Sequence, residues 1–231
     1  MEQYLEEQLR CLCRSVRAAD DRAVEAAKRH WNGIAKPLHG LGRFEDLLTK
    51  VAGIQNTEDI KMDRKVVVVF CADNGVVAEG VTQTDSSVTA VVTENFARGI
   101  ASVNRMASVA GADVIPVDIG VMGEIKEPGV RNCRIADGTN NMRKEPAMSR
   151  EQALEALHTG IRLASELKDT GYDLLAVGEM GIGNTTTSSA VASVLLQAPV
   201  EIVTGRGAGL SNAGLEKKME VIKEALSLIH I

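Results

Sequence analysis

The chain has 231 residues, of which 31 are acidic and 26 are Lys or Arg, so its net charge is −5 and only 3% of its residues are aromatic. The negative charge and the scarcity of aromatic rings argue against a nucleic-acid partner. A hydrophobic fraction of 45% excludes a mainly disordered chain, and this length is enough to bury a sizeable core.

The sequence lacks the usual signals for a membrane or for export. The sequence contains no run of about 18 apolar residues, so no membrane helix is predicted. The acidic residues 1–7 do not resemble a signal peptide. We therefore expect a cytoplasmic protein with no membrane partner and with reduced cysteines. Cys11 and Cys13 form a C-x-C pair, but no second pair or histidine cluster accompanies them, so no metal site is predicted.

The N-terminal part of the chain is predicted to be helical. Apolar side chains at helical spacing predict one amphipathic helix over residues 2–30: Leu5, Leu9, Leu12 and Val16. Pro and Gly residues within 36–43 end that helix, and a short helix is expected over 43–52. Residues 1–62 are therefore assigned to a helical segment that forms part of a small helical domain.

From residue 63 onward, strands and helices alternate. The predicted strands cover 65–70, 113–119, 173–177 and 201–204, and the predicted helices cover 86–109, 149–169, 185–197 and 212–228. This alternation predicts an α/β fold with a parallel, Rossmann-like sheet flanked by helices. Pro116 lies inside the second predicted strand, which indicates an edge position or a bulge.

Four loops rich in Gly or Asp follow the four predicted strands directly: 71–75, 120–123, 178–187 and 205–209. In a parallel sheet all four would meet at the carboxyl edge, where ligands bind. In the third loop, Gly178, Gly181 and Gly183 allow close approach of the backbone to a ligand. The start of the following helix, near Asn184, offers N–H groups that favour a phosphate.

Other interpretations of these loops stay open on the residues alone. The third loop has neither the Lys of a Walker A motif nor the spacing of a dinucleotide fingerprint, and it could be a simple turn whose Asn and Thr residues cap a helix. Glu179 could stabilise a cationic sugar centre, or it could pair with Arg206 or Lys218. Asp73 could hold a ligand or belong to a tight turn. By itself, the Glu-Lys-Lys run that contains Lys218 predicts a solvent-exposed helix face.

Taken together, these segments resemble the nicotinate-nucleotide–dimethylbenzimidazole phosphoribosyltransferase family of cobalamin biosynthesis. The resemblance covers residues 30–226 and is carried by Ala-Asp-Asn-Gly-Val-Val-Ala-Glu-Gly-Val at 72–81, by 88–90, 111–114, 117–120 and 146–149, by Gly-Glu-Met-Gly-Ile-Gly-Asn-Thr-Thr at 178–186 and by Gly-Arg-Gly-Ala-Gly at 205–209. Lys36-Pro37 with Leu41-Gly42-Arg43 is similar to a family turn, from which residues 38–40 depart.

The resemblance implies transfer of phosphoribose from nicotinate mononucleotide to 5,6-dimethylbenzimidazole, giving α-ribazole 5′-phosphate and nicotinate, in a homodimer without a cofactor. It implies that Glu179 stabilises positive charge at C1′. The nucleotide and its phosphate would be bound by Gly181, Gly183, Asn184, Thr185, Thr186, Gly205, Gly207 and Lys218. The benzimidazole pocket would include Asp73, Thr84 and Val92.

Members of this family continue well beyond the length of this chain, and that further part carries additional strands and the glutamate expected to act as general base. The resemblance therefore implies a C-terminally truncated chain whose α/β nucleotide-binding domain, residues 63–231, and whose sheet are incomplete. Two alternatives remain: a non-catalytic module that binds a mononucleotide, and a nicotinamide-dependent oxidoreductase. The oxidoreductase would need a dinucleotide fingerprint that the sequence does not contain.

Overall fold

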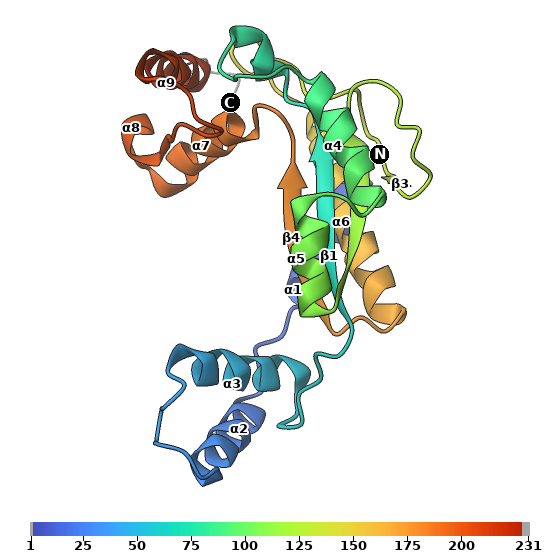
Figure 1. Cartoon of the computed structure of the whole chain (residues 1–231), viewed down its shortest axis with the longest axis vertical. Coiled ribbons are helices and arrows are strands. Elements are labelled where there is room, and N and C mark those ends of the chain that lie inside the picture. The colour runs from blue at the N-terminus through green and yellow to red at the C-terminus, as the bar shows by residue number, and fades with distance from the viewer. Residues whose placement is uncertain (1, 228–231) are drawn as a thin grey trace. The chain divides into compact units, whose positions relative to one another are not determined.

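The computed structural model describes residues 2–227, and the chain divides into two units (Figure 1). One unit comprises residues 6–63, and the other comprises residues 2–5 together with residues 64–227. Within residues 2–227, no helix combines the length and the hydrophobicity needed to cross a membrane.

The helical unit contains two complete helices, α2 (Asp21–Gly33) and α3 (Arg43–Gln55), and most of α1 (Glu2–Ser15). The prediction of one helix over 2–30 is wrong, because the chain leaves helical geometry after Ser15. Asp20 then starts α2 as its N-cap, accepting a hydrogen bond from the N–H of Ala23 at 2.8 Å. The periodicity of the apolar residues continues across this break and conceals it.

The larger unit is built on four strands, β1 (Lys65–Ala72), β2 (Ala112–Gly120), β3 (Arg131–Asn132) and β4 (Leu174–Met180). Their order is β3-β2-β1-β4 and every pair is parallel, as the α/β prediction requires. Among residues 2–227, β3 pairs only with Val117 and Asp118 of β2, so no strand described there pairs with the outer edge of β2 at Pro116. The proline therefore costs no ladder hydrogen bond on that side.

The run of valines in β1 lies at the centre of the sheet and is buried on both faces. On one face Val66 and Val68 pack with Leu163 of α6 (Arg150–Asp169). On the other face Val69 and Cys71 pack near α4 (Ser87–Ala97). Figure 1 shows α4 and α5 (Ser102–Ala110) on one side of the strands and α6 on the other. A strand covered on both faces explains why its sequence does not alternate between apolar and polar residues.

The largest differences from the predicted elements of this unit are a split helix, a strand that is a helix, and a longer strand. The helix expected over 86–109 is split into α4 and α5 by Gly99, whose φ is +74°. The strand expected over 201–204 is wrong, because Val200–Val203 form the short helix α8, which packs on α7 (Asn184–Leu196) and α9 (Asn212–Ser227). β4 extends to Met180, so Glu179 lies in the strand and not in the loop. The end of the last predicted helix, residue 228, lies outside the described residues.

These results change the basis of the ligand-site prediction. Three of the four loops do follow strands that end at one edge of the sheet. The fourth loop, residues 205–209, instead follows the helix α8. Its Gly205 contacts Lys218 of α9, and its Gly207 packs on Thr185 of α7. Among the residues described here, β4 is an outer strand, and the side chain of its Val177 is 70% exposed.

Replacing Gly75 by Ala tests how tightly the end of β1 packs. Gly75 begins the 3-10 helix η1 (Gly75–Glu79), and a Cβ there would lie 2.4 Å from the carbonyl oxygen of Thr139. We expect Gly75→Ala to lower the free energy of unfolding by about 1–3 kcal/mol, because backbone must move to accommodate it. Chemical denaturation measures the change.

Gly160→Ala in α6 is the matched control. No heavy atom lies within 4 Å of its Cβ position, so the substitution should raise stability by about 0.5–1 kcal/mol through helix propensity. Equal effects of the two substitutions would contradict this account of packing at Gly75.

Candidate active site

The start of α7 has two backbone N–H groups without an acceptor in the described part of the chain. Gly183 is the N-cap, with φ of +89° and no side chain to bond to the first helical turn. The N–H of Asn184 bonds to the carbonyl of Gly181 at 3.0 Å, and that of Thr186 bonds to the carbonyl of Gly183 at 2.9 Å. The N–H groups of Gly183 and Thr185 have no acceptor in the described part of the chain. Such groups at a helix start are suited to an anion.

Lys218, on α9, places a buried positive charge next to this helix start. Its side chain is 1% exposed, and its Nζ donates to Thr185 Oγ1 at 2.8 Å and to the carbonyl of Gly205 at 3.0 Å. Both acceptors are neutral, and no carboxylate among residues 2–227 pairs with it. Burial lowers the pKa of Lys218. The local sequence pattern predicted an exposed face here, and that prediction is wrong.

The loop 205–209 packs closely on the same threonine. Gly207 has φ of +58°, and a Cβ there would lie 2.8 Å from Thr185 Oγ1, so the chain needs a glycine at this point. Arg206 is exposed, and its guanidinium donates to the carbonyl of Leu210 at 2.9 Å and to Asn212. Arg206 is therefore not the ion-pair partner that was considered for Glu179.

Glu179 lies on β4 and accepts a hydrogen bond from the side-chain amide of Asn184. The alternative of a pair with Lys218 is also absent from the described residues, because Lys218 bonds to Thr185 and Gly205. Partial burial raises the pKa of Glu179, and the hydrogen bond from Asn184 lowers it in part. The site therefore keeps a carboxylate and an ammonium that do not neutralise each other.

A pocket of about 150 Å³ lies between three segments, 81–84, 181–185 and 206–210. Its lining residues are Val81, Thr82, Gln83, Thr84, Gly181, Ile182, Gly183, Asn184, Thr185, Arg206, Ala208 and Leu210. Of the site residues expected from the sequence, Gly181, Gly183, Asn184, Thr185 and Thr84 line it directly. Gly207 and Lys218 do not line the pocket but contact Thr185, and the carbonyl of Gly205 bonds to Lys218.

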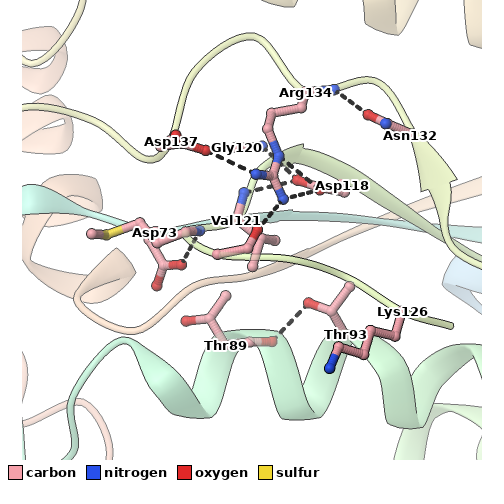
Figure 2. A network of polar contacts seen from close by, with 12 residues as sticks. Asp73, Thr89, Thr93, Asp118, Gly120, Val121, Lys126, Asn132, Arg134 and Asp137 are labelled. Atoms are coloured by element: carbon pink, nitrogen blue, oxygen red, sulfur yellow. Dashed lines mark hydrogen bonds and ion pairs between the residues drawn. The ribbon is translucent and has the colours of Figure 1, made fainter.

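Four more of the expected site residues are also outside this lining. One of them, Glu179, bonds to Asn184, which does line the pocket. Thr186 is fully buried on the inner side of α7, and Val92 lies within α4. Asp73 is also fully buried, and its Oδ2 accepts from the N–H of Met122 at 2.8 Å. In Figure 2 its carboxylate lies beside the turn that Asp118 also holds. Asp73 thus stabilises the loop after β2 in this structure.

Sequence reasoning missed Thr82 and Gln83 as lining residues. The side-chain amide of Gln83 donates to the carbonyl of Gly209 at 2.6 Å, which links two of the segments around the pocket. The motif at 72–81 ends immediately before them, and this proximity is the one signal that pointed to them. A larger pocket of about 610 Å³ lies beside Arg134 of the network in Figure 2, but none of the sequence-derived site residues lines it.

Comparison with known proteins identifies the family to which the chain is similar. A family model described as a phosphoribosyltransferase matches residues 16–230, which is a longer match than the expected 30–226. A nicotinate-nucleotide–dimethylbenzimidazole phosphoribosyltransferase of Acetivibrio thermocellus is 44% identical over 205 residues, covering 89% of this chain and 58% of the relative. The protein of the same name from Clostridium acetobutylicum is 42% identical over 217 residues, covering 94% and 62%.

Solved structures give the same result. The crystal structure of CobT from Thermus thermophilus superposes with a TM-score of 0.83 at 39% identity, covering 88% of this chain and 62% of that chain. This chain thus spans about three fifths of the length of the relatives it matches. On its motifs, its fold and these matches, the chain belongs to the nicotinate-nucleotide–dimethylbenzimidazole phosphoribosyltransferase family.

Proposed function

We propose that the pocket between 81–84, 181–185 and 206–210 binds the phosphoribosyl group of nicotinate mononucleotide for transfer to dimethylbenzimidazole. The observation that carries this proposal is the buried ammonium of Lys218, whose partners are all neutral. An unpaired buried charge costs free energy, and a bound anion offsets that cost. The N–H groups of Gly183 and Thr185 belong to the same helix start that Lys218 contacts through Thr185.

A phosphate anchored here would leave the sugar close to Glu179, because Asn184 belongs to the helix start and also bonds to that carboxylate. In the transfer, the C1′–nitrogen bond to nicotinate breaks and a bond from C1′ to the azole nitrogen forms. Positive charge develops at C1′ as the bond breaks, and a carboxylate at this position would stabilise it. The departing nicotinate nitrogen takes the bonding electron pair and becomes neutral, so no general acid is required.

The azole must also lose its N–H proton, which requires a base. The residues that line the pocket include no Asp, Glu or His. The relatives are longer than this chain, and we propose that the base belongs to that additional length. Thr84 remains our candidate for the benzimidazole side of the pocket, while assembly as a homodimer and a cytoplasmic location stay predictions.

The same absence of a base among the lining residues favours a second candidate, a module that binds the mononucleotide without turnover. Titration calorimetry with nicotinate mononucleotide, combined with an assay for released nicotinate, separates the two. Binding with release supports the transferase. Binding without release supports the module, and absence of binding contradicts both.

Replacing Lys218 by Met tests the anion site. We expect Lys218→Met to weaken binding of nicotinate mononucleotide by at least about tenfold, since the positive charge behind the anion-binding helix start is lost. The free energy of unfolding without ligand should stay the same or rise by about 1 kcal/mol, because an unpaired buried charge is removed. Calorimetry and chemical denaturation measure the two effects.

Lys217→Met is the control, since Lys217 is exposed on the same helix and does not make the bonds to Thr185 and Gly205 that Lys218 makes. Lys217→Met should change neither the affinity for nicotinate mononucleotide nor the free energy of unfolding appreciably. Equal losses of affinity in the two variants would show that only the overall charge matters, which contradicts a specific role for Lys218.

Glu179→Gln tests the proposed charge stabilisation at C1′. We expect release of nicotinate to fall by about 10–100-fold while the dissociation constant for the mononucleotide changes by less than about threefold. Because the pKa of Glu179 is raised, turnover by the unaltered protein should decline as pH falls through a range above the ordinary glutamate value of 4.5. A turnover number unchanged by the substitution removes Glu179 from the mechanism.

The folded-state pKa of Glu179 also predicts how pH affects stability. The folded state binds this proton more tightly than the unfolded state, so its contribution to the free energy of unfolding decreases as pH rises from about 4.5 through the raised pKa. Glu179→Gln should abolish that decrease. Denaturation curves across this pH range measure it, and identical pH profiles would contradict the assigned shift.

A further inference from the structure

The turn that joins β4 to α7 is held from outside by two side chains. The side-chain amide of Asn74, in the loop after β1, donates to the carbonyl of Ile182 at 3.1 Å. The hydroxyl of Thr89, on α4, accepts from the N–H of Ile182 at 3.1 Å. Both backbone polar groups of Ile182 are therefore bonded to side chains of neighbouring elements, which limits rotation of the turn about this residue.

Asn74 makes a second contact, on the helix side of the turn. Its Oδ1 lies 3.0 Å from Thr187 Oγ1, and this hydroxyl belongs to the first turn of α7. A single amide group thus spans the turn from Ile182 to the helix. Since Asn74 comes two residues after the end of β1, the central strand of the sheet, it links the turn to the buried part of the unit.

The glycines of the turn fit closely against Asn74. A Cβ on Gly181 would lie 2.9 Å from Asn74 Nδ2 and 2.1 Å from the carbonyl oxygen of Ala72. A Cβ on Gly183 would lie 3.2 Å from Asn74 Cβ. These glycines are therefore required by the packing of the protein itself, and not only by the approach of a ligand as the sequence suggested.

We propose that Asn74, assisted by Thr89, is a positioning residue for the anion-binding turn. Asn74 does not line the pocket between 81–84, 181–185 and 206–210, so it acts through the turn and not on the ligand. By holding Ile182 on both sides, the two side chains fix the direction of the unpaired N–H groups of Gly183 and Thr185. Donors fixed in advance lose less conformational entropy when the anion binds. This inference rests on the proposed function for the identity of the anion.

The test uses Asn74→Ala with two ligands, nicotinate mononucleotide and inorganic phosphate. We expect the dissociation constants of both to rise by a similar factor, about tenfold, because the loss of two hydrogen bonds loosens the part that holds the phosphate group. Amide hydrogen exchange in the unliganded chain should become faster at residues 182–187 but not within β1. Asn74→Asp keeps the acceptor for Thr187 but loses the donor to Ile182, so it should not restore the affinity.

Asn140→Ala is the matched control. The amide of Asn140 also bonds to a backbone carbonyl, that of Pro146 at 3.2 Å, but it contacts neither the turn nor the pocket. It should leave both dissociation constants and the exchange at 182–187 unchanged. An Asn74→Ala variant that is destabilised but keeps its ligand affinity and its exchange pattern would overturn the positioning role.

Failure of the proposed function gives a different result. If the unaltered chain binds neither the mononucleotide nor phosphate, the assigned ligand is wrong, and hydrogen exchange alone decides the role of Asn74. Faster exchange at 182–187 in Asn74→Ala would then support its hold on the turn, and unchanged exchange would overturn it.

Discussion

The buried ammonium of Lys218 is the constraint on which the account of the site depends. Its two hydrogen-bond partners, Thr185 Oγ1 and the carbonyl of Gly205, belong to the head of α7 and to the loop after α8. The lysine thus brings three separate segments of the chain together. Because both partners are neutral, the charge is hydrogen-bonded but not neutralised. The positive charge is therefore already in place in the unliganded protein, where it would favour binding of an anion.

The rest of the larger unit positions this charge. The buried valines of β1 make it the central strand, and the chain that leaves β1 carries Asn74 to the turn at the head of α7. Glu179 bonds to Asn184 and stays separate from Lys218. Under the proposed function, these opposite charges would serve different parts of one ligand, the phosphate and the developing positive charge of the sugar.

Much of the sheet could be predicted, because a run of β-branched residues such as 65–70 has few alternatives to a buried strand. The strand expected over 201–204 failed because Val200 packs between α7 and α9, a tertiary contact that overrides local β propensity. The single helix expected over 2–30 failed because Asp20 caps a new helix. The spacing of apolar residues alone does not reveal an N-cap such as Asp20.

The sequence predicted the parts of the candidate site that depend on backbone conformation, but the local pattern did not predict which charged side chain is buried. The glycines and Asn184 at the head of α7 followed from their spacing, but Lys218 resembled an exposed lysine in a charged run. A signal was present, because Lys218 falls on the same helix face as the buried Val221, Ile222 and Ala225. Asp73 stays a predicted ligand contact. The structure adds that it is fully buried and accepts a hydrogen bond from the N–H of Met122, which the sequence did not indicate.

The most direct test is the pKa of Lys218 itself, measured by NMR of its side-chain nitrogen with and without inorganic phosphate. We expect a pKa below 10.5 in the unliganded chain, because of burial, and an increase when phosphate binds, because a neighbouring anion favours the charged form. A pKa that does not respond to saturating phosphate would contradict the assignment of Lys218 to an anion site.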